Sequence, residues 1–116
     1  MVRIKAVDPE QASGEAKGLL EETARLFGGT VPNLMRTMVN APGVLRTWID
    51  TFKALSTRFS EPLRAQIAIA VAEANACDYC LSANTYFGKS AGLSDAAAEA
   101  SRNARAIDPK TEALLQ

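Results

Sequence analysis

The amino-acid sequence predicts an all-α protein, and three observations support this fold class. Apolar residues recur at helical spacing along most of the chain, alanine dominates the 47% apolar share, and only residues 1–8 alternate apolar and polar side chains as a strand does. Because a lone strand has no second strand to pair with, residues 1–8 are expected to form a short extended arm. The length of 116 residues fits a single domain over residues 1–116.

Proline, glycine and capping residues place the ends of the predicted helices. Pro9 fits a first-turn position, and Gly28-Gly29 ends the first helix. Ser60 can cap a helix with Pro62 in its first turn, and Gly92 is the C-terminal stop of the following helix. The predicted helices cover residues 9–27, 34–40, 44–57, 61–76, 80–91, 96–105 and 108–116.

Two of these helices have apolar faces: one is wide enough for a buried core, and the other is incomplete. The helix at residues 44–57 has an apolar stripe wide enough to be core, and Trp48 within it is expected to be a core or interface anchor rather than a ligand-stacking residue. In the last helix, Leu114 and Leu115 begin an apolar stripe that does not continue. Either a neighbouring subunit covers these leucines or the C-terminal helix is shortened from a longer parent.

The composition excludes several classes of function. With 13 basic and 13 acidic side chains, no net charge attracts nucleic acid or an anionic membrane. No signal-peptide pattern and no apolar run of about 20 residues is present, so a cytoplasmic protein is expected. The absence of histidine excludes Ser-His-Asp and Cys-His catalysis and His-ligated metals. No cofactor or metal is expected, although two chains together could supply four thiolates to zinc.

Two residues separate the two cysteines, Cys77 and Cys80, which lie in a polar segment, and this spacing is a redox motif. Two thiols so close can form a disulfide without a large chain rearrangement, and the N–H groups at a helix start favour the thiolate. Cysteines three positions apart on a helix can also be ordinary small core residues. Asp78 between them and Asn84 beside them favour the redox interpretation, because thiol reactivity needs partial exposure.

Helical spacing predicts a cluster around these thiols. Asn84 lies four residues after Cys80, and Glu73 lies one turn before Cys77 if the helix continues between them. The Glu73 carboxylate could accept a thiol proton, and the Asn84 amide could donate a hydrogen bond to a thiolate. Glu73 could equally mark the solvated edge of an apolar helix. The candidate catalytic residues are therefore Cys80, Cys77, Glu73 and Asn84.

The run LRAQIAIAVAEANACDYCLSANT at residues 63–85 resembles the core of the carboxymuconolactone decarboxylase / AhpD-like alkylhydroperoxidase family. The resemblance extends to Tyr86-Phe87-Gly88-Lys89 and Gly92-Leu93-Ser94-Asp95, and less distinctly to Pro32-Asn33-Leu34. It implies an AhpD-like helical bundle whose central helical hairpin carries the CxxC pair. It also implies a homo-oligomer, from dimer to trimer or hexamer.

The same resemblance implies peroxide reduction, with Cys80 attacking a hydroperoxide, Cys77 resolving the sulfenic acid, and a dithiol or protein thiol as reductant. Two positions depart from the redox-active members: Asn84 replaces a histidine, and Ala65 replaces a glutamate. Those groups form a proton relay, and general-base help is worth ~10²- to 10⁴-fold. Three alternatives stay open: a slow peroxidase, an enzyme of the decarboxylase branch, and a non-catalytic oligomeric module with a redox-sensing or structural disulfide.

Overall fold

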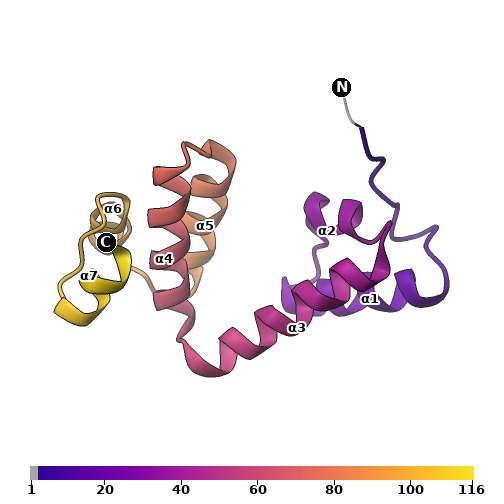
Figure 1. Cartoon of the computed structure of the whole chain (residues 1–116), viewed down its shortest axis with the longest axis horizontal. Coiled ribbons are helices and arrows are strands. Elements are labelled where there is room, and N and C mark those ends of the chain that lie inside the picture. The colour runs from indigo at the N-terminus through magenta and orange to yellow at the C-terminus, as the bar shows by residue number, and fades with distance from the viewer. Residues whose placement is uncertain (1–2) are drawn as a thin grey trace. The chain divides into compact units, whose positions relative to one another are not determined.

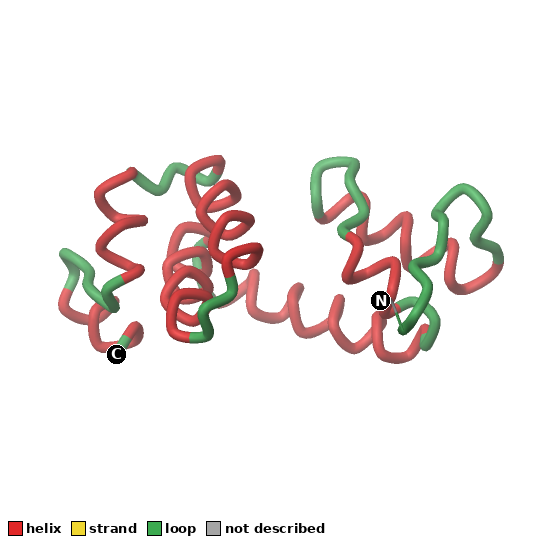
Figure 2. The backbone as a smooth tube through the Cα atoms, turned by 90° about the horizontal axis from the view of Figure 1, so that it is seen from above, coloured by secondary structure: helices red, strands yellow, loops and turns green. Residues whose placement is uncertain are grey.

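A computed structural model describes residues 3–116, and all its regular secondary structure is helical (Figures 1 and 2). No strand occurs within these residues, so the predicted all-α class is confirmed. The first two residues of the predicted arm lie outside the described part. The helices are α1 (Gly14–Leu26), α2 (Asn33–Met38), α3 (Pro42–Arg58), α4 (Glu61–Ala74), α5 (Asp78–Ser90), α6 (Asp95–Arg102) and α7 (Pro109–Leu115).

Contacts between residues group the chain into two compact units, Met1–Leu55 and Ser56–Gln116. The first unit contains α1, α2 and most of α3, and the second contains α4 to α7. That both belong to one domain stays a prediction. None of the helices within residues 3–116 has the length and apolar character needed to cross a membrane.

The first unit is built around large aliphatic side chains. Trp48 packs against this core, as predicted for an anchor, and its ring stacks on Phe52 with 5.2 Å between centroids. Residues 3–8 have no regular secondary structure, and the Val7 N–H donates to the Arg36 carbonyl while Arg36 Nε donates to the Val7 carbonyl. The buried core residues are Leu19, Leu20, Met35, Val39, Leu45 and Ile49.

The first helix begins later than predicted. Pro9 lies in a turn rather than in the first turn of a helix, and α1 starts at Gly14. The Asp8 side chain accepts a hydrogen bond from the Glu10 N–H, and the Asp8 carbonyl accepts one from the Gln11 N–H. These local bonds stabilise a turn at the position where the sequence pattern predicted helix.

In the second unit, α4 and α5 form an antiparallel hairpin against which α6 and α7 pack (Figure 1). The predicted central hairpin is therefore present. The two helices approach closely at Gly88, where an added Cβ would lie 2.9 Å from the Cβ of Ala65. The buried apolar residues of this unit's core are Ala65, Ile69, Leu93 and Ala98.

Side chains cap the helices of this unit. Ser60 accepts a hydrogen bond from the Leu63 N–H at the start of α4, as predicted, with Pro62 in the first turn. Ser94 and Asp108 cap α6 and α7 in the same way.

The predicted C-terminal ends of α4 and α6 were two to three residues too late: α4 ends at Ala74 and α6 at Arg102. Ala76 and Ala104, with φ of 51° and 52°, turn the backbone out of the helix.

Candidate functional site

The CxxC pair follows the tight turn that joins α4 to α5. The N–H groups of Ala76 and Cys77 donate to the carbonyls of Glu73 and Ala72, each at 3.0 Å, and so close the end of α4. Ala76 adopts the left-handed conformation that this reversal needs. The chain then enters α5 at Asp78, which leaves Cys77 as the residue that caps the helix.

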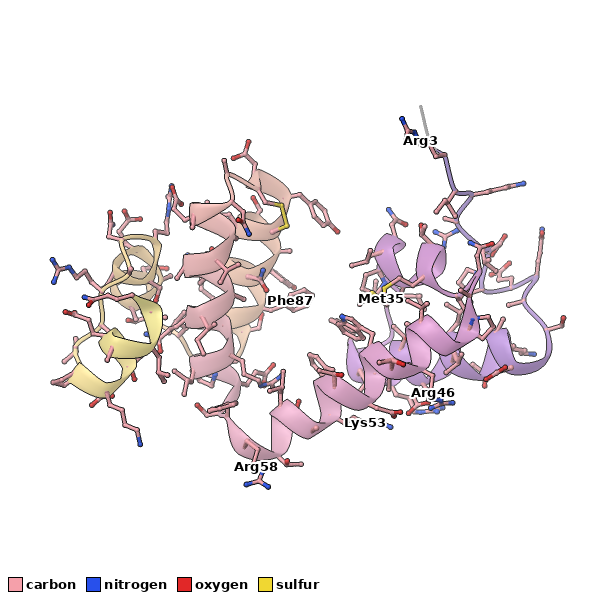
Figure 3. All side chains as sticks on the ribbon, in the orientation of Figure 1. Arg3, Met35, Arg46, Lys53, Arg58 and Phe87 are labelled. Carbon is pink, nitrogen blue, oxygen red and sulfur yellow. A yellow bond between two sulfur atoms is a disulfide. The ribbon has the colours of Figure 1, made fainter. Side chains whose placement is uncertain are left out.

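The structure joins Cys77 and Cys80 in a disulfide, with 5.3 Å between their Cα atoms (Figure 3). Both residues are half-buried. The Sγ atom of Cys77 accepts a hydrogen bond from the Cys80 N–H at 3.3 Å, so a sulfur satisfies one of the free N–H groups in the first turn of α5. The two thiols that the sequence predicted to be neighbours are thus brought together at a helix start.

Asn84 lies one turn after Cys80, as the spacing predicted, but its amide has another partner. Its Nδ2 atom donates to the Cys80 backbone carbonyl at 2.8 Å. Within residues 3–116, no hydrogen bond joins this amide to either sulfur. In this state of the molecule, Asn84 therefore supports the backbone of α5 rather than the sulfurs.

Glu73 is bonded to a residue outside the predicted cluster, Arg102 of α6. Its Oε2 atom accepts a hydrogen bond from Arg102 Nε at 2.7 Å, and this bond raises the pKa of the Arg102 guanidinium. Because α4 ends at Ala74, Glu73 and Cys77 do not stack along one continuous helix. The second position that departs from the redox-active members, Ala65, is buried in the core of this unit.

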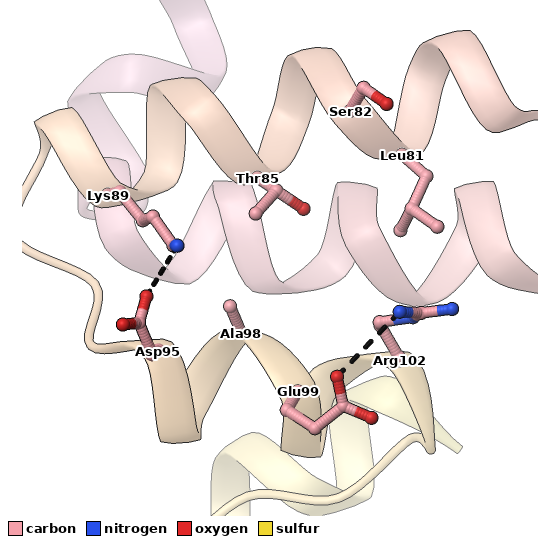
Figure 4. A pocket seen from close by; sticks show the side chains of 8 residues that line it. All are labelled: Leu81, Ser82, Thr85, Lys89, Asp95, Ala98, Glu99 and Arg102. Atoms are coloured by element: carbon pink, nitrogen blue, oxygen red, sulfur yellow. Dashed lines mark ion pairs between the residues drawn. The ribbon is translucent and has the colours of Figure 1, made fainter.

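Arg102 also belongs to a groove of about 490 Å³ between α5 and α6 (Figure 4). The charged groups in the groove pair with one another: Lys89 with Asp95, and Arg102 with Glu99 at 3.7 Å. Arg102 and Glu73 are 29 residues apart, and no local spacing could have linked them. The remaining lining residues are Leu81, Ser82, Thr85 and Ala98.

A metal centre has no obvious ligands in the part of the chain that is described. Among residues 3–116, no three side chains of the types His, Cys, Asp and Glu gather closely enough to hold an ion. The groups with chemical potential around the turn between α4 and α5 are the two sulfurs, the N–H groups of the first turn of α5, and the Glu73 carboxylate that is bonded to Arg102.

The fold and the site define a helical protein whose central hairpin carries a disulfide between the two cysteines of a CxxC pair. The family model described as the carboxymuconolactone decarboxylase family matches residues 42–116, which is more than half of the chain. The chain belongs to this family, and the resemblance predicted from the sequence is confirmed. Comparisons with curated proteins and with solved structures gave no match.

Proposed function

We propose that the protein is a thiol-dependent hydroperoxidase-like oxidoreductase that cycles Cys77 and Cys80 between dithiol and disulfide. One observation carries the proposal: two half-buried sulfurs are bonded to each other at the start of α5. A cysteine at a helix start loses its proton more readily, and partial exposure lets a small oxidant reach it. Family membership supports an enzyme of the peroxidase or the decarboxylase type.

In the proposed cycle, Cys80 reacts with the oxidant and Cys77 resolves the product. The Cys80 thiolate attacks the terminal oxygen of a hydroperoxide, the O–O bond breaks, and an alcohol forms with one proton from solvent, which leaves a sulfenic acid. Cys77 displaces the sulfenic oxygen as water and forms the disulfide. A dithiol or a protein thiol reductant then returns two electrons and two protons to the cysteines and becomes oxidised.

The groups that remain for proton transfer suggest slow turnover. Asn84 cannot accept a proton, Ala65 carries no acid, and the Glu73 carboxylate is bonded to Arg102. This arrangement favours a second candidate, a non-catalytic module in which the disulfide senses redox conditions or is structural. The CxxC pair favours both over the decarboxylase branch, which does not depend on such a pair.

We further propose a cytoplasmic homo-oligomer. The second unit exposes large apolar side chains on α4, α5 and α7, including Val71, Phe87 and Leu114. A neighbouring subunit would remove these side chains from water. Light scattering that finds only a 12.4 kDa species at micromolar concentration would count against the oligomer.

Peroxide consumption by the reduced chain tests the proposed function. Without a reductant, we expect the wild-type chain to consume one equivalent of peroxide and to form the Cys77–Cys80 disulfide. Cys80→Ser should consume almost none, whereas Cys77→Ser, the matched control, should react once and stop at a sulfenic acid. Equal rates for wild type and Cys80→Ser would remove the peroxidase claim and leave the sensing or structural role.

The variant Asn84→His, tested in the same assay, measures how much a base at this position changes the rate of the reaction with peroxide. A histidine at this position could take the thiol proton, so we expect the reaction with peroxide at neutral pH to accelerate by up to ~10²-fold. Asn84→Gln keeps an amide and controls for the longer side chain. An unchanged rate in Asn84→His would mean that proton transfer does not limit this site.

A further inference from the structure

We propose that Arg102 is a positioning residue that holds Cys77 within reach of Cys80 through the turn between α4 and α5. The inference rests on the proposed dithiol/disulfide cycle and concerns the step in which Cys77 closes the disulfide. It assigns to α6, which contains neither cysteine, the support of the segment that carries the resolving thiol.

The first observation is that Glu73 is bonded both to α6 and to the turn. Its side-chain Oε2 accepts a hydrogen bond from Arg102 Nε at 2.7 Å, and its backbone carbonyl accepts one from the Ala76 N–H at 3.0 Å. Glu99, one turn before Arg102 in α6, lies 3.7 Å from the guanidinium and orients it from its own helix (Figure 4). Because Ala76 directly precedes Cys77, a continuous series of contacts joins the guanidinium to the resolving cysteine.

The second observation is that the conformation of the turn depends on its neighbours. Ala76 has a φ of 51°, a left-handed conformation that is unfavourable for a residue with a Cβ. The Ala76 side chain is exposed, so its own packing does not compensate. Besides the bond to Glu73, the turn is closed by the Cys77 N–H, which donates to the Ala72 carbonyl at 3.0 Å. Such a backbone conformation persists where surrounding contacts hold it, and the Glu73–Arg102 pair is a contact that reaches outside the α4–α5 hairpin.

The ion pair matters most when the disulfide is open. In the oxidised chain, the bond between Cys77 and Cys80 itself restrains the turn. In the reduced chain this covalent restraint is gone, whereas the Arg102–Glu73 pair contains no sulfur and persists. Without the pair, Ala76 would relax toward a more favourable backbone conformation and carry Cys77 away from Cys80. The pair therefore raises the effective concentration of the Cys77 thiol at the Cys80 sulfur, which favours closure of the disulfide.

Lys89 provides a matched control in the same groove. It pairs with Asp95, and its side chain is 49% exposed, against 43% for Arg102. Lys89 is in the last turn of α5 and Asp95 is the first residue of α6, so this pair is remote from the turn that precedes α5. Replacing either cation by glutamine removes one positive charge and one ion pair, but only Arg102→Gln releases Glu73.

The thiol–disulfide equilibrium with glutathione tests the proposal. One glutathione disulfide takes two electrons from Cys77 and Cys80, and the two cysteine protons end on the two glutathione thiols that form. The chain is equilibrated in buffers of known glutathione ratio and quenched with acid, and its oxidised fraction is measured by mass spectrometry. We expect Arg102→Gln to lower the equilibrium constant of disulfide formation about two- to fivefold, the range that exposed ion pairs give. Lys89→Gln should keep the wild-type constant, and Arg102→Lys, which keeps a cation for Glu73, should recover part of the loss.

Replacing the other partner checks that the effect passes through Glu73. Glu73→Ala should lower the equilibrium constant as much as Arg102→Gln does, and the double variant should lose no more than either single variant. A wild-type constant in Arg102→Gln, equal losses in Arg102→Gln and Lys89→Gln, or losses that add in the double variant would overturn the proposal.

Amide hydrogen exchange supplies a second readout, which a general structural role of Arg102 would not give. In the reduced chain, we expect the N–H groups of Ala76 and Cys77 to exchange faster in Arg102→Gln than in wild type. In the oxidised chain the disulfide should keep this difference small, and an equal acceleration in both states would contradict the proposal. Neither measurement uses peroxide, so a chain without peroxidase activity can still support the assignment, and an active peroxidase can still contradict it.

Discussion

The two units of the chain are built in different ways, and the difference begins in their cores. In the first unit every buried apolar residue is a leucine, isoleucine, valine or methionine, and aromatic rings of Phe27, Trp48 and Phe52 stack beside them. In the second unit two of the four core residues are alanines, and Gly88 lies against Ala65. The first unit gains stability from burying large side chains, whereas the second depends on close approach of helix backbones.

The two units also differ in how their helices begin. In the first unit, neither Ser13 before α1 nor Pro32 before α2 provides a side-chain cap. In the second unit, all four helices α4 to α7 have one, and in α5 the cap is the Cys77 sulfur. The site thus lies on helices whose starting residues are fixed by local chemistry. In α5 the capping residue is itself one of the two bridged cysteines, so the cap and the disulfide depend on the same residue.

The largest contrast is expected when the same substitution is made at one glycine of each unit. In Gly88→Ala the new Cβ would meet the Ala65 Cβ at 2.9 Å and a Leu93 methyl at 3.1 Å, so we expect a loss of about 1–3 kcal/mol. In Gly18→Ala, within α1, nothing lies within 4 Å of the new Cβ, and higher helix propensity should add roughly 0.5–1 kcal/mol.

Urea unfolding measures both changes. Circular dichroism at 222 nm follows the helices of both units, and fluorescence of Trp48, the only tryptophan, follows the first unit. If both alanine substitutions shifted stability in the same direction, the contrast between close backbone packing and open helix surface would be wrong.

A smaller contrast is expected at two serines that precede helices. Ser94 Oγ accepts a hydrogen bond from the Ala97 N–H at 3.1 Å, so Ser94→Ala should cost about 1 kcal/mol. Ser13 occupies the same position before α1 but makes no such bond, and Ser13→Ala should be close to neutral. Thermal unfolding of the two variants compares them directly, and an equal loss in both would show that side-chain caps do not distinguish the units.

The sequence predicted the fold class and most helices because those depend on periodic apolar residues, which are visible in a single chain. It missed features that depend on contacts across the fold. Two residues after the ends of α4 and α6, the backbone turns at alanines with positive φ, Ala76 and Ala104, and alanine carries no turn signal. The late start of α1 depends on hydrogen bonds to Asp8, which compete locally with the helix.

At the candidate site too, the feature that depends on sequence spacing was predicted correctly, whereas the hydrogen-bond partners of the polar groups were not. Cys77 and Cys80 pair through a spacing that can be read directly from the sequence. The partners of the polar groups could not be predicted, because each group had several acceptors or donors in reach. Glu73 bonds to Arg102 on another helix, and Asn84 bonds to a carbonyl of its own helix instead of a sulfur.

The smallest effect is expected from two carboxylates whose pKa is lowered for different reasons. In the first unit, a hydrogen bond from Lys53 is the main cause that lowers the pKa of Glu22. A hydrogen bond from Arg46 lowers this pKa further, whereas burial of the carboxylate raises it. In the second unit, hydrogen bonds from the side chain and backbone of Thr111 lower the pKa of Asp108 at the start of α7. The partners of Glu22 are charged, whereas Thr111 is neutral.

The sign of the pH dependence is the same for both groups, but its response to salt should differ. A lowered pKa in the folded state gives stability that is fully present above the ordinary values of 4.5 for Glu22 and 3.8 for Asp108, and that is lost as the pH falls through the folded values. Glu22→Gln should cost less than about 1 kcal/mol near neutral pH, and added salt should reduce this cost because it screens ion pairs. The loss in Asp108→Ala should persist in salt. Urea unfolding at low and high salt measures both, and a salt-sensitive Asp108→Ala would mean that charge, rather than the hydrogen bonds from Thr111, stabilises the start of α7.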